Sequence, residues 1–398
     1  MTMWLIPRHR IPHGPRSLFW LMPALAMGTA IGLAAGLVAV NYTWNVTSPF
    51  VFQGTPSDAH SSLNSIVTAM ISLIALVFSV TFVALQLTAG QLSPRVLQIF
   101  LHDRIIQLTF GVFVASFVYS MVVLQTVKPG ADVPRPAVSV AFLFVFASAC
   151  VFTLYIGHVA QLMRASTLIA EIAHQARRVL ERDYPTGLAQ PKDVDRLPSP
   201  ERVIAAPRAG IMIAVNAPVL VQLGARTECV FVLRHRLGDF VPEGAPLITV
   251  RGEPHDVDHL VARVCKQVAL GVERVLVQDL TFGFRHLIDI AERALSPSTN
   301  DPTTACRAVD ALHDLLRQLA IRPPVSEAVC GPGGAVRLVI PRHQFADLLD
   351  LTMREIWLYG SEAAQVPDRI ATMLADLADV ARPEHQDTVR HWLQVTRA

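Results

Sequence analysis

The chain has 398 residues, of which 52% are hydrophobic and 17% are charged, and its formal net charge at pH 7 is +2. The charged fraction lies below the roughly 25% of ordinary soluble domains, which argues against a protein that is soluble throughout. The small net charge and the lack of a long basic run give no indication of a nucleic-acid partner.

Four uninterrupted apolar runs follow one another in the first part of the chain. Each has 22 to 25 residues and contains no Asp, Glu, Lys or Arg, and a helix needs about 20 apolar residues to cross a bilayer. The first run exceeds the roughly 7–15 residues of a signal-peptide core, so we interpret it as a retained anchor. We predict a membrane domain over residues 1–160 with four transmembrane helices, at Leu18–Val40, Leu63–Leu87, Ile105–Val127 and Pro136–Gly157.

Basic residues are distributed unevenly around these runs. Arginine is frequent before the first run and after the fourth, whereas the loop from Asn41 to Ser62 has no Lys or Arg. The short third loop carries Lys128 and Arg135. Because positively charged segments tend to stay in the cytoplasm, the pattern predicts a bacterial inner-membrane protein with both termini cytoplasmic.

The first run contains Gly28, Gly32 and Gly36 at intervals of four residues. Glycines on one face of a helix let two backbones approach closely, which favours helix association in lipid. The repeat therefore predicts a helix-packing face. This face is either an interface between subunits or a contact within one four-helix bundle.

The second run carries a polar stripe. Ser65, Ser72, Ser79 and Gln86 recur at intervals of seven, and Thr68 lies one turn from Ser65. A Gln amide in lipid is costly, so the stripe should face protein or water. It either lines a pore, where hydroxyl and amide groups replace part of an ion's hydration shell, or forms a hydrogen-bonded seam between helices.

Three further regions follow the membrane domain. Residues 161–200 continue the helical apolar stripe of the fourth run and then become rich in proline and charge, which predicts a helical stalk and a linker. Residues 201–252 contain short β-branched runs between turn residues, which predicts a small β module. Residues 253–398 return to helical periodicity, with one predicted strand at Val336–Ile340.

Four segments of the chain also resemble a known family. They are "RAGIMIAVNAPVLVQLG", "LGDFVPEGAPLITV", "FGFRHLIDIAERALSPSTNDPTTA" and "FADLLDLTMREIWLYG". In this order they resemble the bacterial predicted membrane proteins of domain-of-unknown-function family 2254, over nearly the whole chain. The resemblance implies a multi-pass membrane protein and assigns no activity or substrate.

The β module is also similar to barrel-sandwich domains of the biotinyl and lipoyl kind, through "GDFVPEGAPL". A carrier of biotin or lipoate needs a lysine on an exposed hairpin, and the three lysines, Lys128, Lys192 and Lys266, all lie outside the module. A prosthetic-group carrier is therefore excluded. The predicted fold class is an α-helical transmembrane domain of four spans plus a cytosolic α+β region with a small barrel-sandwich-like β module.

The segment "ALSPSTNDPTTACRA", Ala294 to Ala308, contains the break between two predicted helices. Pro297 ends the first helix, and an Asp before Pro302 is typical of an N-cap with proline at the first helical position. One interpretation is a sharp joint, capped by Asp301 or Asn300. The other is a polar pocket at a helix N-terminus that binds an anion. The candidate pocket residues are Arg285, Asp289, Arg293, Ser298, Thr299, Asn300, Asp301 and Thr303.

Motifs of enzymes and metal sites are missing from the sequence. It has no G-x-S-x-G, H-E-x-x-H, P-loop or G-x-G-x-x-G motif, and its five cysteines form no C-x-x-C pair. We therefore expect no enzymatic activity, no cofactor and no metal site.

The absence of carboxylates, lysine and arginine from the four runs disfavours a proton-driven transporter. The leading hypothesis is a homo-oligomeric, channel-like protein controlled by its cytosolic domain, with membrane lipid and a small anion or other ion as partners. The alternative is a non-conducting membrane scaffold or sensor that binds a cytosolic partner or a small ligand.

Overall fold

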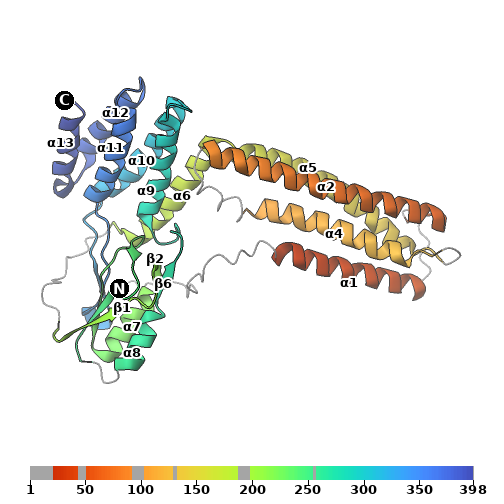
Figure 1. Ribbon diagram of the computed structural model, residues 1–398, viewed down its shortest axis with the longest axis horizontal. Helices are drawn as coiled ribbons and strands as arrows, with labels where there is room; N and C mark the ends of the chain where they lie inside the picture. Colours follow the sequence, from red (N-terminus) through yellow and green to blue (C-terminus); the bar gives the residue numbers. More distant parts are fainter. Residues whose placement is uncertain are drawn as a thin grey trace. The chain divides into compact units, whose positions relative to one another are not determined.

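The computed structural model describes residues 21–43, 51–91, 103–128, 132–186, 198–253 and 257–397. The chain divides into two compact units (Figure 1). The membrane unit comprises the described residues up to Thr167, and the C-terminal unit comprises those from Leu168 onward. The first twenty residues, with the arginines that precede the first apolar run, lie outside the described residues.

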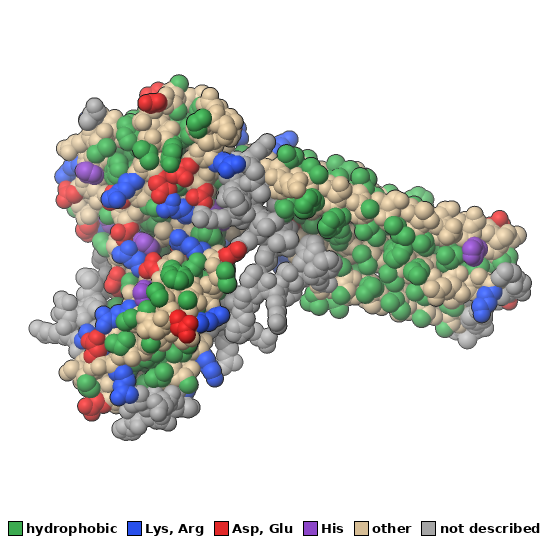
Figure 2. All heavy atoms as spheres, viewed as in Figure 1, with side chains coloured by type: hydrophobic (Ala, Val, Ile, Leu, Met, Phe, Trp, Pro, Cys, Tyr) green, Lys and Arg blue, Asp and Glu red, His purple; other side chains and the backbone are tan. Residues whose placement is uncertain are grey.

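The membrane unit contains four helices long and apolar enough to cross a bilayer, which confirms the four predicted spans. They are α1 (Leu21–Thr43), α2 (Pro56–Gln91), α4 (Arg104–Thr126) and α5 (Arg135–Leu162). Figure 2 shows hydrophobic side chains covering this unit. Asp103 caps α4 by accepting hydrogen bonds from the amides of Ile105 and Ile106, at 2.8 and 3.1 Å, and it also pairs with Nε2 of His158 at 2.8 Å.

Helix α4 is the central helix of the membrane unit and contacts α1, α2 and α5. Its contact with α1 is built from small residues: a Cβ at Gly111 would lie 3.5 Å from the Cβ of Ala26, and Ala30 and Ala34 of α1 are buried. Tyr119 of α4 is fully buried, and its hydroxyl donates to the carbonyl of Ala137 on α5 at 2.8 Å.

The helix predicted after the fourth span is present, and it is separate from the helix of that span. Helix α5 ends at Leu162, and a new helix, α6 (Ala165–Asp183), begins after two intervening residues. The apolar stripe of α6 is buried inside the C-terminal unit at Leu168, Ile169, Ile172, Ala176, Val179 and Leu180. An apolar face of this length is stabilised by packing rather than by exposure to water. Most of the predicted linker lies outside the described residues.

The approach of α6 to the rest of the C-terminal unit depends on one glycine. A Cβ at Gly283 of α9 (Leu280–Leu295) would lie 2.8 Å from the Cβ of Ala176 on α6, which is too short for two carbon atoms. Arg322 reinforces the contact by donating to the carbonyl of Leu180 at 3.1 Å and to that of Tyr184. These contacts fix the C-terminal end of α6 in the C-terminal unit.

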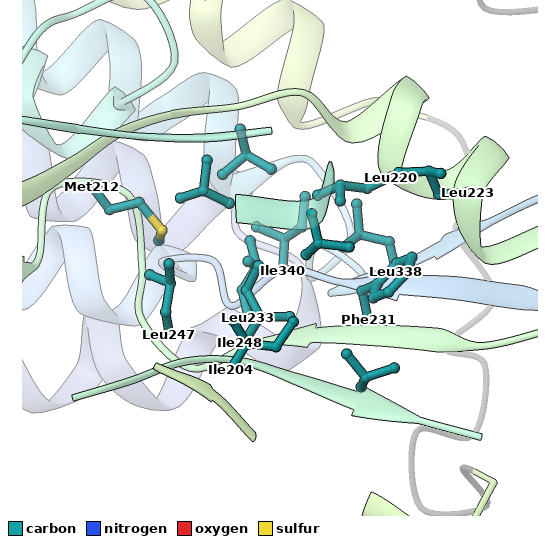
Figure 3. Close-up of a cluster of buried hydrophobic side chains, with 14 of the residues drawn as sticks. Ile204, Met212, Leu220, Leu223, Phe231, Leu233, Leu247, Ile248, Leu338 and Ile340 are labelled. Carbon is teal, nitrogen blue, oxygen red and sulfur yellow. The ribbon is translucent and has the colours of Figure 1, made fainter. Parts of the chain in front are cut away.

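The described strands form a five-stranded sheet of order β1-β5-β3-β8-β7 and a three-stranded sheet of order β4-β2-β6. The described pairings are antiparallel except for β3 with β8, which is parallel. The strands are β1 (Glu201–Ala205), β2 (Gly210–Val215), β3 (Val230–Leu233), β4 (Phe240–Val241), β5 (Pro246–Arg251), β6 (Val268–Gly271), β7 (Ala328–Cys330) and β8 (Val336–Val339). Figure 3 shows part of the buried core around them, in which Phe231 lies beside Leu338 from a distant part of the chain, and Met212 and Ile248 belong to the same cluster.

This arrangement does not confirm a barrel-sandwich module at residues 201–252. The four β-branched runs do form β1, β2, β3 and β5, but the sheets also recruit β6, β7 and β8 from beyond residue 252. The segment after β2 is a helix, α7 (Ala217–Thr227), in which Leu220, Leu223 and Gly224 are buried. A Cβ at Gly224 would lie 2.8 Å from the carbonyl oxygen of Cys229, so this helix packs too closely for a larger residue.

The remaining helices confirm the helical periodicity predicted after residue 253. They are α8 (Val257–Cys265), α9, α10 (Pro302–Ala320), α11 (Phe345–Gly360), α12 (Val366–Val380) and α13 (Gln386–Val395), with the short 3-10 helices η3 (Pro332–Gly334) and η4 (Pro383–His385). Helix α9 packs against α10 and α11, and α10 packs against α12. The predicted strand at Val336–Ile340 is β8.

Candidate functional sites

The glycine face of α1 is open. Gly28, Gly32 and Gly36 are exposed, and a Cβ at any of them would meet nothing within 4 Å. Close packing inside the bundle therefore uses the alanines of α1 and Gly111 of α4, and not these glycines. The interpretation as an interface between subunits stays a prediction.

The polar stripe of α2 also faces away from the other helices of the unit. Its five residues, Ser65, Thr68, Ser72, Ser79 and Gln86, are all exposed. The buried residues of α2, among them Leu63, Met70 and Val77, lie on the other side of the helix. A seam between α2 and the described helices of the same chain is therefore not present.

Hydroxyl groups of the stripe have hydrogen-bond partners within their own helix, whereas the side-chain amide of Gln86 does not. Ser65, Thr68 and Ser72 donate to the backbone carbonyl four residues earlier, at 2.9, 3.0 and 3.2 Å. Within the part of the chain that the structure describes, the Gln86 amide has no hydrogen-bond partner. A hydroxyl that back-bonds to its own helix tolerates lipid, whereas an amide without a partner does not.

Buried small polar residues lie on other helices, where the sequence analysis did not place them. Ser116 and Ser120 of α4 and Ser148 of α5 are buried, and their hydroxyls lack hydrogen-bond partners among the described residues. The spacing of four between Ser116 and Ser120 was the signal available in the sequence. These residues let α4 pack closely at the centre of the unit.

The segment between α9 and α10 is a tight joint. Asp301 is the N-cap of α10, as one interpretation predicted: it accepts from the Thr304 amide at 3.0 Å and from the Thr304 hydroxyl at 2.6 Å. These hydrogen bonds lower the pKa of Asp301. Asn300 adopts the left-handed conformation, with φ 45°, that asparagine tolerates better than most residues. The cap is therefore Asp301, and Asn300 makes the turn.

The structure does not bring the eight predicted pocket residues together in one cavity. Arg293, Ser298, Thr299, Asn300 and Thr303 are exposed. Asp289 is half-buried on α9, and Asp301 is engaged in capping. Arg285 alone among the eight lines the described cavity.

That cavity, which we call the arginine cavity, has a volume of about 500 Å³ and belongs entirely to the C-terminal unit. Three separate segments contribute to it: the turn before β4, the first turns of α9 with the chain leading into it, and α11 with the residues before it. Its lining consists of Arg236, Leu237, Asp239, Arg274, Thr281, Arg285, His343, Asp347, Asp350, Leu351, Arg354 and Glu355. Sequence periodicity gave no sign of it because these segments are more than 100 residues apart at their extremes.

Arg274 is held rigidly at the wall of the arginine cavity. Its Nε donates to Oδ2 of Asp279 at 2.8 Å, and its guanidinium lies 5.2 Å from the ring centroid of Phe282. Asp279 is only 3% exposed and also caps α9 by accepting from the Phe282 amide at 3.0 Å. Burial raises the pKa of Asp279, and the charge and hydrogen bond of Arg274 counteract that effect.

Gly238, in the turn before β4, lies directly against the ion pair of Arg274 and Asp279. Its φ is +92°, and a Cβ there would lie 2.5 Å from Oδ2 of Asp279 and 2.6 Å from a guanidinium nitrogen of Arg274. Both the backbone conformation and the lack of space require glycine at this position.

At the other end of the cavity, Arg285 forms an ion pair with Glu355, and Glu355 also shares a hydrogen bond with Glu292. Burial raises the pKa of Glu292 to about 7, and the hydrogen bond and charge of Glu355 act in the same direction. Burial opposes ionisation of Glu355 too, but hydrogen bonds from Arg285 and Glu292 hold its pKa below the ordinary value. Glu292 therefore keeps its proton to a higher pH than Glu355 does.

Arg236 is held more loosely than Arg274. Its guanidinium lies 3.4 Å from Nδ1 of His343 and 3.8 Å from a carboxylate oxygen of Asp347. Burial and the charge of Arg236 lower the pKa of His343, so this imidazole is neutral at pH 7. The carbonyl of His343 accepts a hydrogen bond from Tyr184, which follows α6, at 2.9 Å.

The described residues contain no arrangement of side chains suited to bind a metal ion. No group of three or more His, Cys, Asp or Glu side chains in that part is placed to hold a metal ion. The chemistry available in the arginine cavity is therefore that of guanidinium, imidazole, hydroxyl and carboxylate groups, which supports binding of a polar ligand through hydrogen bonds and charge.

Comparison with known proteins places the whole architecture in a family. A family model described as predicted membrane protein matches residues 16–376. Uncharacterized proteins of Mycobacterium bovis and Mycobacterium tuberculosis are each 30% identical over 375 residues, which is 90% of this chain and 71% of theirs. No solved structure matches the chain. The chain belongs to the predicted membrane proteins of domain-of-unknown-function family 2254.

Proposed function

We propose that this protein is a homo-oligomeric, channel-like protein of the bacterial inner membrane, in which the polar stripes of α2 from several copies line a hydrated path. One observation carries the proposal: the stripe faces away from the protein's own helices, and its Gln86 amide has no partner among the described residues. Transfer of such a group to hydrocarbon costs several kcal/mol, so a second copy or water must meet it.

The open glycine face of α1 supports assembly from several copies. A helix face without side chains allows the backbone of a neighbouring helix to approach, and van der Waals packing then drives association in lipid. Gly28, Gly32 and Gly36 have open space above them in the single chain. A neighbouring copy would fill that space.

The chemistry of the spans supports passive conduction rather than proton-coupled transport. The four apolar runs contain no Asp, Glu, Lys or Arg, and proton-coupled carriers rely on such groups within the membrane. Hydroxyl and amide groups along α2 instead offer oxygen atoms that replace part of an ion's hydration shell. The proposal therefore includes no enzymatic step, and it places both termini in the cytoplasm on the basis of the arginine distribution.

A specific contact favours a second role, that of a membrane sensor. Helix α6 follows the last span after two residues, and Tyr184 at its end donates to the carbonyl of His343 at the arginine cavity. Arg342 beside it donates to the carbonyl of Asp183 at 2.6 Å. A ligand that displaces this segment would also displace the end of α6, with or without conduction in the membrane.

The proposal predicts that water reaches the polar stripe of α2. Cys150 is exposed on α5, so it and the other native cysteines are first replaced by alanine. Ser72→Cys and Ser79→Cys then introduce thiols on the stripe with little change in volume. In membranes, both are expected to react with a water-soluble methanethiosulfonate reagent, because the reactive thiolate forms where water reaches.

Two neighbouring positions serve as matched controls for this labelling. Phe78 is 62% exposed but lies off the stripe, and Val77 is buried against the other helices; position 77 is about 140° around the helix from position 72. Phe78→Cys and Val77→Cys should both remain unlabelled, one in lipid and one in protein. Equal labelling at positions 72, 78 and 79, or protection of all of them, would contradict a path along the stripe.

A further inference from the structure

The arginine cavity is lined by both positive and negative side chains, and each kind limits which ligands can bind there. Arg236, Arg274 and the N-terminus of α9 gather at one end. The carboxylates of Asp347 and Asp350, which we call the acidic wall, lie on α11 and also line the cavity, and that of Asp347 lies 3.8 Å from Arg236. A volume of about 500 Å³ lies within the range of roughly 300–1,000 Å³ that is usual for small-molecule sites.

The positive end is built to hold an anionic group. Arg274 is fixed by Asp279 and Phe282, so little conformational entropy is lost when it binds. Arg236 has only distant partners, at 3.4 and 3.8 Å, so its donors are available to a ligand. The first amides of α9 add the positive end of a helix dipole.

The hydroxyl of Thr281 is a further group that a ligand in the cavity can use. Thr281 lies in the first turn of α9, lines the cavity and is only 8% exposed. Its hydroxyl has no hydrogen-bond partner among the described residues. Because Thr281 lines the cavity, its hydroxyl can donate a hydrogen bond to a ligand oxygen there in place of water.

The acidic wall excludes a bare anion as the best ligand. Asp347 accepts from the Gln344 amide at 2.9 Å, and Asp350 accepts from Nε1 of Trp392 at 2.7 Å, so both carboxylates are oriented. Each still has lone pairs that can accept further hydrogen bonds. A hydroxyl-bearing ligand would use them, whereas a free anion would be repelled by their charge.

We propose that the arginine cavity binds a small phosphorylated polyol or sugar, with its phosphate at Arg236, Arg274 and Thr281 and its hydroxyl groups on Asp347 and Asp350. The phosphate accepts charge-assisted hydrogen bonds from the two guanidinium groups and one from the Thr281 hydroxyl. The site lies in the C-terminal unit, and its existence is independent of whether the membrane unit conducts.

Isothermal titration of the full-length protein in detergent tests this proposal with three probes: ribose 5-phosphate, inorganic phosphate and ribose. Ribose 5-phosphate is expected to bind more tightly than inorganic phosphate, and ribose is expected not to bind. Arg236→Gln should weaken the binding of ribose 5-phosphate by about tenfold or more. Thr281→Val, which removes the hydroxyl at nearly constant volume, should weaken it by about fivefold.

The control for net charge is Arg317→Gln. Arg317 lies on α10, outside the cavity lining, and pairs with Asp376 at the surface. Its replacement should leave the affinity for ribose 5-phosphate unchanged. Lack of binding of both phosphorylated probes at millimolar concentrations would overturn the proposal, as would an equal loss of affinity in Arg236→Gln and Arg317→Gln.

Discussion

Replacement of Asp279 by alanine is expected to lower the free energy of unfolding of the C-terminal unit by about 3–5 kcal/mol. The carboxylate is 3% exposed, caps α9 through the Phe282 amide and neutralises Arg274. Its removal leaves a largely buried guanidinium without a counter-charge and an amide of the first turn without an acceptor. Denaturant unfolding of the purified protein, followed by the fluorescence of tryptophans in the C-terminal unit, measures the loss.

Asp301→Ala is the matched control for the capping contribution. Asp301 caps α10 in the same way, but it is only partly buried and forms no ion pair with any residue that the structure describes. Loss of this cap should cost about 1 kcal/mol. If both variants lost about the same free energy of unfolding, the contribution assigned to the buried Asp279–Arg274 pair would be wrong.

Raising the pH from about 5 to 8 is expected to destabilise the C-terminal unit through Glu292, by on the order of 1–2 kcal/mol. In the folded chain the pKa of Glu292 is raised to about 7 from its ordinary value of 4.5. Between these two values the folded state binds the proton and the unfolded state does not. The stabilising proton is therefore lost as the pH rises through this window.

Glu292→Gln isolates this contribution, because the amide donates to Glu355 at every pH as the protonated carboxyl does. Other groups change the free energy of unfolding with pH in the opposite direction or over a different pH range. The lowered pKa values of His343 and His385 make stability rise with pH up to about 6.5, and the lowered pKa of Glu355 acts below 4.5.

The informative quantity is thus the difference between the unfolding free energies of wild type and Glu292→Gln at pH 5 and at pH 8. The variant should gain stability relative to wild type as the pH rises. A difference that is independent of pH would show that Glu292 titrates at its ordinary value.

The sequence predicted those parts of the molecule whose signal is local. Four charge-free runs identified the spans because their length alone matches a bilayer. The proline after Asp301 identified a helix start because capping involves only adjacent residues. The β-branched runs similarly located β1, β2, β3 and β5.

Features that depend on partners distant in sequence were not predictable in this way. The parallel pairing of β3 with β8 joins segments about a hundred residues apart, and the stretch of α7 is rich enough in β-branched residues to resemble a strand. On α1, alanines and glycines are both small enough for close packing, so periodicity could not tell which face meets α4. The arginine cavity was missed because its lining comes from three separate segments.

The central claim, a hydrated path along the polar stripe of α2, is tested most directly by current through the purified protein in a planar bilayer. The protein carrying Ser79→Cys as its single cysteine should conduct, and a positively charged methanethiosulfonate reagent should reduce its current by placing bulk and charge in the path. The same reagent should leave the current of the Val77→Cys protein unchanged, because Val77 is buried against the other helices. Absence of current, or a current that modification at position 79 does not alter, would contradict the claim.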